Sequence, residues 1–229
     1  MADQYIRDYV LPIVEIEKQD SVMKIKKFCG TCFLVNGSQN AITCKHITEN
    51  KNNLFVLSVQ NGKWVPIKIT KSIEHETEDV AVIEFENFKI LPDDSFFELV
   101  NSQEYSSRQY AQWSYPEDVV YEIFDSESNS SVIRPDLVYL QGYIRRRLNN
   151  KGIMPNVHSL SLYELSELGI GGCSGSPIVK YPTSVGSNWE VIGIYCAFRT
   201  TEMYGSKVQL GYAVRMETVY NWISDNLLK

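Results

Sequence analysis

The chain has 229 residues, of which 44% are hydrophobic and 22% are charged, and its formal net charge is -6. This length and composition allow a substantial buried core, so we expect folding without a metal, a cofactor or disulfides. The acidic balance excludes the basic surface that attracts nucleic acid, and no stretch approaches the roughly 20 apolar residues that span a membrane. The one dense positive run, residues 145–147, is expected on a solvated face.

The N-terminal segment and the cysteines bear on the compartment. The first 20 residues contain early acids and no apolar run of signal-peptide length. The cysteines are odd in number and lack the spacing of a small secreted domain, so we expect free thiols. We therefore predict a cytoplasmic protein, or a domain excised from a larger one. The cysteines are Cys29, Cys32, Cys44, Cys173 and Cys196.

Short runs of β-branched and aromatic residues dominate the first half of the chain. Turn residues separate them about every 8–12 positions, a spacing typical of a β-sandwich or barrel. Asn-Gly pairs mark turns at 36–38 and 61–62, and Asn61-Gly62 is the sharpest hairpin signal. The predicted strands are Val10–Glu17, Met23–Phe28, Thr31–Val35, Ala41–Cys44, Leu54–Val59, Trp64–Thr70 and Val80–Phe85.

A second set of strands follows the polar segment 101–107. We therefore predict an all-β protein with two β units of similar length, residues 1–102 and 103–229. The second set comprises Gln109–Trp113, Val119–Ile123, Leu137–Arg145, Ser159–Leu165, Ser176–Lys180, Val191–Phe198 and Val208–Val214.

Two segments of the second unit stand apart from the strand pattern. Segment 125–131 is charged and has no apolar residue, so an exposed loop is expected there. Segment 216–228 has the spacing of one apolar helical face, and this C-terminal helix should pack on the second β unit. The face is formed by Val219, Trp222, Ile223 and Leu227.

A serine bracketed by glycines, Ser174, lies in the segment Gly-Gly-Cys-Ser-Gly-Ser-Pro at 171–177. Glycines without Cβ atoms let the backbone turn tightly and approach a ligand, so Ser174 should stand exposed. A serine hydroxyl is a poor nucleophile near neutral pH and needs a base within about 2.6–3.2 Å, a role that suits histidine.

His46 is the favoured base among the three histidines. It lies just past an apolar strand, so its ring can project from a rigid element toward a cleft, whereas His75 and His158 lie in polar loops and are expected at the surface. An acid must fix the tautomer of the base, and Asp79 opens the apolar strand Asp-Val-Ala-Val-Ile. Three nearby acids remain rivals on spacing alone: Glu74, Glu76 and Glu78.

These segments, in the order His, Asp, Ser, resemble the chymotrypsin/trypsin-like serine peptidase family, and its bacterial branch in particular. The resemblance covers most of the chain and implies a serine endopeptidase that acts on protein or peptide substrates. The matching segments are 30–35 with 42–47 around the histidine, 79–83 at the aspartate, 172–177 at the nucleophile, and 191–195 and 211–214 as cleft strands.

The resemblance implies two perpendicular antiparallel six-stranded β-barrels, followed by the C-terminal helix, with the active site between the barrels. His46 would act as general base, Asp79 as its orienting group and Ser174 as nucleophile. The backbone N–H groups of Gly172 and Ser174 would form the oxyanion hole.

The chain departs from the family at two positions. Cys173 stands where members activated by N-terminal cleavage have an aspartate, so we expect regulation by a partner, a fused domain or rearrangement of 169–173 instead. Ile47 follows His46 directly, so the disulfide that flanks the histidine in secreted relatives is absent. This again suggests a reducing compartment.

The family pattern also assigns a primary specificity pocket. It places Leu168 near the floor of this pocket and Gly211 on the neighbouring strand. Three consecutive residues form one wall. No charge is evident there, so we expect a shallow pocket for small or medium apolar side chains; Arg199 could instead favour an acidic one. The wall comprises Cys196, Ala197 and Phe198.

Several other interpretations compete with the enzyme. The pair Cys29 and Cys32, with Cys44 and His46, suggests a zinc site, but an offset of three puts the pair on opposite faces of a strand. Cys173 is an alternative nucleophile. The fold could also serve as an inactive binding module, or as a structural barrel with an accidental Gly-Cys-Ser-Gly.

Overall fold

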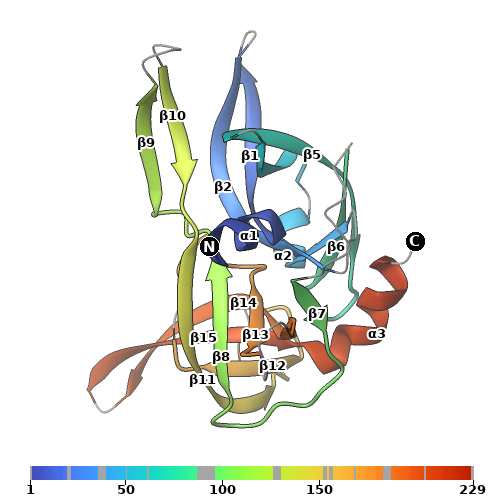
Figure 1. Ribbon diagram of the computed structural model, residues 1–229. Coiled ribbons are helices and arrows are strands. Elements are labelled where there is room, and N and C mark those ends of the chain that lie inside the picture. Colours follow the sequence, from blue (N-terminus) through green and yellow to red (C-terminus); the bar gives the residue numbers. More distant parts are fainter. Residues whose placement is uncertain are drawn as a thin grey trace.

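The computed structural model describes residues 2–19, 22–35, 40–49, 51–60, 62–86, 96–125, 130–151, 154, 157–167, 169–182, 187–203 and 205–227. Most of these residues form strands in two β units stacked on one another (Figure 1). In chain order, the elements are α1 (Ala2–Tyr9), β1 (Val10–Gln19), β2 (Val22–Leu34), β3 (Asn40–Thr43), α2 (Lys45–Thr48), β4 (Leu54–Gln60), β5 (Lys63–Glu74), β6 (Ala81–Phe85), β7 (Phe97–Leu99), β8 (Gln109–Ser114), β9 (Val120–Asp125), β10 (Ser130–Pro135), β11 (Val138–Asn149), β12 (Ser161–Leu165), β13 (Pro177–Lys180), β14 (Trp189–Met203), β15 (Ser206–Arg215) and α3 (Met216–Leu227).

The first unit is a closed antiparallel barrel of six strands in the order β1-β2-β3-β6-β5-β4. Strands β1 and β4 pair to close the ring, with Ile13 opposite Val56. Strands β3 and β6 are each buried over three successive residues, which means that both of their faces are covered. They are also the strands next to His46 and Asp79, so the site is built on the most enclosed part of this barrel.

The second unit is a sheet of seven strands in the order β13-β8-β11-β12-β15-β14-β7. An additional antiparallel pairing of β13 with β14 joins six of these strands into a ring. The seventh strand, β7, pairs parallel with β14 outside that ring. The all-β fold with two β units is therefore confirmed. Strand β7, from the part of the chain predicted for the first unit, is additional to the six strands that the resemblance implies for the second barrel. The predicted strand 119–123 corresponds to β9, which pairs with β10 in a separate two-stranded sheet.

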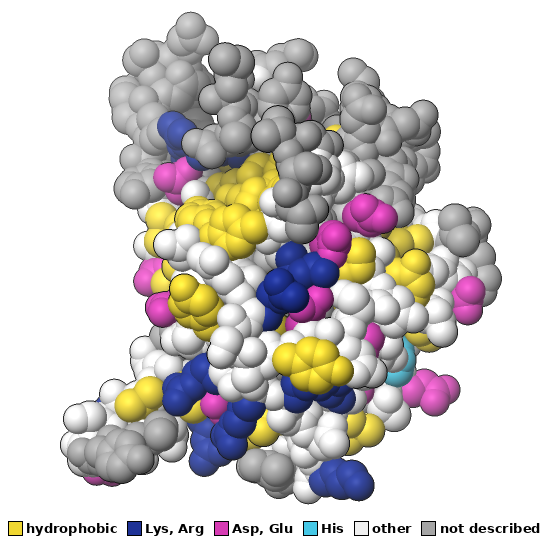
Figure 2. Space-filling view, turned by 60° about the horizontal axis from the view of Figure 1, so that its bottom comes forward, with side chains coloured by type: hydrophobic (Ala, Val, Ile, Leu, Met, Phe, Trp, Pro, Cys, Tyr) yellow, Lys and Arg dark blue, Asp and Glu magenta, His cyan; other side chains and the backbone are white. Residues whose placement is uncertain are grey.

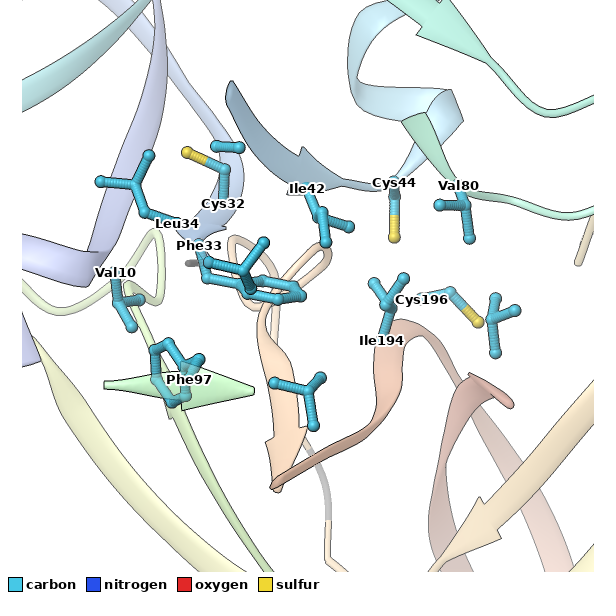
Figure 3. Packing of buried hydrophobic residues seen from close by; sticks show 14 of the residues in the cluster. Val10, Cys32, Phe33, Leu34, Ile42, Cys44, Val80, Phe97, Ile194 and Cys196 are labelled. Atoms are coloured by element: carbon cyan, nitrogen blue, oxygen red, sulfur yellow. The ribbon is translucent and has the colours of Figure 1, made fainter. Parts of the chain in front are cut away.

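The barrels share one hydrophobic core, which fixes how they sit relative to each other. Figure 3 shows Phe33 and Ile42 of the first barrel beside Phe97 and Ile194 of the second, all completely buried. Removing such side chains from water stabilises the fold by about 1.5–3 kcal/mol each. Groups from the two barrels can therefore be held in register across the interface.

Helix α3 confirms the amphipathic pattern at the C-terminus. Met216, Val219 and Ile223 are buried, and Trp222 and Leu227 are partly buried against the core. The helix contacts β14 and β15, as expected, and also β6 of the first barrel. No helix in the described part of the chain is long and apolar enough to cross a membrane.

Local differences from the predicted elements are limited. Strand β2 runs without a break through Cys29 and Gly30, and α1, α2, β7 and β10 were not predicted. Asp125 and Ser130 pair in the β9–β10 hairpin, while 126–129 of the predicted loop lie outside the described residues. The predicted turn 36–38 and Asn61 also lie outside them; Gly62 has the positive φ of a hairpin turn, 75°.

The arginine run 145–147 lies on β11 among acids. Arg145 and Arg146 pair with Glu164, and Arg147 pairs with Glu217. On the face shown in Figure 2, the described basic side chains are interspersed with acidic and apolar ones. Each arginine of the run is therefore paired with an acidic side chain.

Candidate active site

His46 is presented by the single helical turn α2, directly after strand β3. Cys44 before the turn is extended, with φ -83° and ψ 143°, so the chain changes direction there. Ile47 and Thr48 are buried and anchor the turn, while the His46 side chain is 40% exposed. The imidazole is thus exposed, while the helical turn that carries it is anchored in the core.

Asp79 is buried just before β6 and contacts His46 at two points. Its Oδ2 lies 2.6 Å from His46 Nδ1, and its Oδ1 accepts the backbone N–H of His46 at 2.9 Å. A neutral ring held this way carries its proton on Nδ1 and leaves Nε2 as an acceptor. This pair therefore sets the tautomer that a general base needs.

The three rival acids have other surroundings. Glu74 accepts a hydrogen bond from the Thr48 hydroxyl, and Glu78 accepts the backbone N–H groups of Leu160 and Ser161. Glu76 is exposed. Asp79 is thus the carboxylate that the fold brings to His46, a choice that spacing in the sequence left open.

The Ser174 loop is pressed against the first barrel. The carbonyl of Ser174 accepts the backbone N–H of Thr31 at 2.8 Å, and Gly175 N–H donates to Tyr195 O at 2.7 Å. Gly175 has φ 89°, and a Cβ there would overlap the Thr31 carbonyl and the Thr43 hydroxyl. Only glycine allows this close approach, as expected from the sequence.

The Ser174 hydroxyl faces the carbonyl of Cys196 at 3.4 Å. Within the described residues, no hydrogen bond links it to His46. The two segments nonetheless meet at one acceptor, because Tyr195 O receives both Gly175 N–H and the Cys44 thiol, the latter at 3.1 Å. The serine loop and the histidine turn are therefore tied to the same point.

The peptide orientations in the loop leave two N–H groups available. In a trans peptide, N–H and C=O point in opposite directions. The Gly171 carbonyl accepts Glu117 N–H at 2.8 Å, and the Cys173 carbonyl accepts Ser176 N–H at 3.1 Å. The N–H groups of Gly172 and Ser174, which belong to the same two peptides, consequently point away from those partners, and they donate to no backbone acceptor of the described chain.

A cleft of about 460 Å³ opens beside the His46–Asp79 pair. It lies where the histidine turn and the segment before β6 face the β11–β12 connection of the second barrel. Its lining is mixed, with charged, polar and apolar side chains. It is formed by Lys45, His46, Glu49, Glu76, Thr77, Asp79, Asn150, Met154, Val157, His158, Ser159 and Leu160.

The predicted specificity residues lie on a different part of the second barrel. Cys196 and Gly211 are buried, Ala197 is half-buried and Phe198 is 48% exposed, on strands β14 and β15. Leu168 lies outside the described residues. Their assignment to a substrate pocket remains a prediction.

The five cysteines are free thiols in this structure. Cys173 is buried and its sulfur accepts the Ser114 hydroxyl at 3.1 Å, and burial raises the pKa of its thiol. Burial likewise raises the pKa of Cys44 and of Cys196. A protonated, enclosed thiol is a weak nucleophile, which favours Ser174 over Cys173.

One group of possible metal ligands occurs among the described residues: Cys44, His46 and Asp79, whose ligand atoms lie within 4.8 Å of one another. The His46 and Asp79 atoms already contact each other, and the Cys44 thiol donates to Tyr195 O. Cys29 and Cys32 are not part of this group; their sulfurs face the carbonyls of Lys27 and Leu11. The zinc set considered from the sequence is thus not brought together.

Comparison with known proteins gives the fold. No family model matches the chain, and no curated protein sequence matches it. Among solved structures, the active form of the Rv3671c protease from M. tuberculosis superposes with a TM-score of 0.59 at 15% identity, covering 97% of this chain and 82% of that one. An inactive serine-to-alanine mutant of Rv3671c from M. tuberculosis H37Rv gives 0.59 at 13% identity, with 97% and 88% covered.

The chain has the chymotrypsin-like fold. At these identities the likeness concerns the arrangement of the strands and does not extend to activity. The roles of individual residues rest on the geometry described above.

Proposed function

We propose that this chain is a serine endopeptidase with Ser174 as nucleophile, His46 as general base and Asp79 as the orienting group. The observation that carries the proposal is the two-point contact of Asp79 with His46, at 2.6 and 2.9 Å, next to a serine loop tied to the same barrel interface. An aspartate that binds histidine Nδ1 in this way orients the ring and leaves Nε2 free to accept a proton from serine.

The proposed reaction follows from these positions. The Ser174 Oγ attacks the carbonyl carbon of the substrate while His46 Nε2 takes the hydroxyl proton. The N–H groups of Gly172 and Ser174 stabilise the oxyanion that forms, and His46 then protonates the leaving amine. Water, activated by the same imidazole, releases the acyl group from Ser174.

The hydroxyl must move toward His46 for this step, because it faces Cys196 O in the structure. Such catalytic hydrogen bonds are often long without substrate and shorten in the complex. Rotation about the Cα–Cβ bond of Ser174 is the simplest way to reach the ring, since the backbone on both sides is held by Thr31 and Tyr195.

For the substrate, we propose an extended peptide whose primary side chain contacts Cys196, Ala197 and Phe198. These residues present no charge, so a small or medium apolar side chain is favoured over a basic one, which would be buried unpaired. Arg199 is exposed next to this wall and would favour an acidic side chain if the pocket extends to it. Hydrolysis of a peptide library distinguishes these cases, and a clear preference for Arg or Lys would contradict both.

The catalytic proposal is tested with a fluorophosphonate probe, which reacts with an activated serine. We expect wild type to be labelled and Ser174→Ala to be unlabelled, with hydrolysis falling by about 10⁶-fold. Ser206→Ala, which changes an exposed hairpin serine, is the control and should be labelled as wild type is. Equal labelling of Ser174→Ala would reject the assignment.

The alternative is a binding module of the same fold without turnover, and the contact of Ser174 Oγ with Cys196 O rather than with His46 favours it. In that case, folded wild type would not be labelled under any condition, and His46→Ala would bind peptides as wild type does. New N-termini that appear in a lysate with wild type but not with Ser174→Ala would instead establish the peptidase and reveal its substrates.

A further inference from the structure

The turn that carries Asp79 is built around a second histidine, His75. This residue follows β5 directly, and its backbone N–H donates to the carbonyl of Val80 at 2.9 Å, which closes the segment 75–80 into a loop. The sequence placed His75 at the surface, but its side chain is half-buried. Its ring is therefore part of the structure of the turn.

The His75 ring accepts two hydrogen bonds from within the turn. Its Nδ1 receives the backbone N–H of Thr77 at 3.2 Å and that of Glu78 at 3.1 Å. A ring nitrogen accepts hydrogen bonds only when it carries no proton, and both nitrogens of a charged imidazole are donors. The turn is consequently complete only with a neutral His75.

Groups from two helices contact His75. Trp222 of α3 packs against it edge-on, with ring centroids 4.9 Å apart, and Lys45 of α2 donates to the His75 carbonyl at 3.2 Å. Burial lowers the pKa of His75, whereas the nearby Glu78 and Glu76 raise it and Lys45 lowers it further. The balance of these effects favours the neutral form that the two N–H groups require.

The residues that the ring holds are also fastened to the second barrel. Glu78 Oε2 accepts the N–H groups of Leu160 and Ser161 at 3.0 and 3.3 Å, and Asp79 N–H donates to Ser159 Oγ at 2.7 Å. The Asp79 carboxylate then meets His46. The His75 ring is thus connected through Glu78 to Asp79, the next residue, whose carboxylate contacts His46.

We infer that His75 is a positioning residue: its neutral imidazole folds the 75–79 turn so that Asp79 meets His46, and protonation of His75 releases that turn. This inference rests on the proposed function. It adds a second ionisation to the site, on a group that touches neither the substrate nor Ser174.

Two variants test the hydrogen-bond acceptor of His75 and its aromatic packing separately. His75→Asn keeps an acceptor, Oδ1, near the place of Nδ1 but does not titrate, whereas His75→Phe keeps the aromatic contact with Trp222 and has no acceptor. We expect His75→Asn to keep kcat within about threefold at neutral pH and His75→Phe to lower kcat by about 10–100-fold with KM changed by less than about twofold. Equal kcat values for wild type and His75→Phe would overturn the inference.

The pH dependence of kcat/KM tests whether protonation of His75 lowers activity. On the acid side, the logarithm of kcat/KM should fall with a slope of 1 where His46 alone protonates and steepen toward 2 in wild type as His75 also protonates. In His75→Asn the slope should stay at 1 throughout. An identical steep limb in both proteins would assign the second proton elsewhere and would reject His75 as its site.

A measurement without turnover keeps this test apart from that of the proposed function. The proton between His46 Nδ1 and Asp79 gives a low-field NMR signal, which we expect in wild type and His75→Asn and expect to be lost in His75→Phe. Nitrogen-15 shifts should also show Nδ1 of His75 without a proton at neutral pH. If no variant hydrolyses peptides but these signals behave as expected, the peptidase proposal fails and His75 still positions Asp79; a protonated Nδ1 would overturn the inference whatever the activity.

Discussion

The two halves of the site differ in how completely they are assembled. On the first barrel, His46 and Asp79 are joined by two short hydrogen bonds, and Asp79 is almost fully buried. On the second barrel, the backbone around Ser174 is held firmly, but its hydroxyl has only a 3.4 Å contact to Cys196 O. The proposed base is thus already oriented, whereas the proposed nucleophile has no hydrogen bond to it among the described residues.

Contacts across the interface between the barrels decide whether the halves align. Thr31 of β2 makes most of those on the serine side: its N–H binds Ser174 O, and its hydroxyl binds Gly172 O at 2.8 Å while accepting Tyr115 N–H at 3.0 Å. On the aspartate side, Glu78 and Asp79 bind the segment 159–161. Each half is therefore positioned by residues of the opposite barrel.

The largest expected effect comes from the half that is already assembled. Asp79→Asn places an amide N–H₂ opposite His46 Nδ1, so the ring turns to the tautomer with its proton on Nε2 and can no longer accept the Ser174 proton. By analogy with other triads, kcat should fall by about 10⁴-fold with little change in folding. Steady-state hydrolysis at neutral pH measures the effect.

Asp136→Asn serves as the control for that change, because Asp136 is a half-buried aspartate that pairs with Arg7. Its kcat should equal that of wild type. A similar loss in both variants would mean that net charge, rather than the His46 tautomer, accounts for the Asp79 result.

The second-largest expected effect concerns the loop that carries Ser174. Gly175→Ala puts a Cβ onto the Thr31 carbonyl and the Thr43 hydroxyl, so the serine loop must withdraw from the first barrel. We expect a loss of about 3 kcal/mol in the free energy of unfolding and about 100-fold or more in kcat/KM. Urea unfolding and peptide hydrolysis measure the two quantities.

Gly205→Ala separates the overlap from backbone strain. Gly205 has φ 75°, similar to the 89° of Gly175, but a Cβ there would meet nothing within 4 Å. It should cost about 1–2 kcal/mol and leave kcat/KM unchanged. If Gly175→Ala costs no more than Gly205→Ala, close packing of the loop on Thr31 does not hold the serine in place.

The sequence was sufficient to find the elements of the site where local chemistry is distinctive. Glycines around Ser174 and an apolar strand ahead of His46 are signals within a few residues of the group that they place. Asp79 was also named from the sequence, but its spacing did not exclude Glu74, Glu76 and Glu78, and the fold shows that the Asp79 carboxylate contacts His46.

Contacts between segments that are far apart in the chain could not be predicted from local sequence patterns. Ser159 lies 80 residues from Asp79, and no local pattern relates them. Strand β7 has three residues and pairs in parallel with a strand that follows about 90 positions later, so its register has no nearby signal. His75 appeared solvated because its neighbours are acidic, while Trp222, which covers it, is supplied by the C-terminal helix.

The smallest expected effect tests whether the aspartate half depends on the second barrel. Glu78→Leu leaves the N–H groups of Leu160 and Ser161 without an acceptor, whereas Glu78→Gln keeps an oxygen for both and removes only the charge. We expect Glu78→Leu to lose about 2–4 kcal/mol of unfolding free energy and about tenfold in kcat/KM, and Glu78→Gln to stay within about threefold. Glu84→Leu, which removes a surface partner of Lys71, should cost less than about 1 kcal/mol and leave kcat/KM unchanged. If Glu78→Gln falls as far as Glu78→Leu, the charge of Glu78 acts on His46, and the hydrogen bonds to the second barrel are not what positions Asp79.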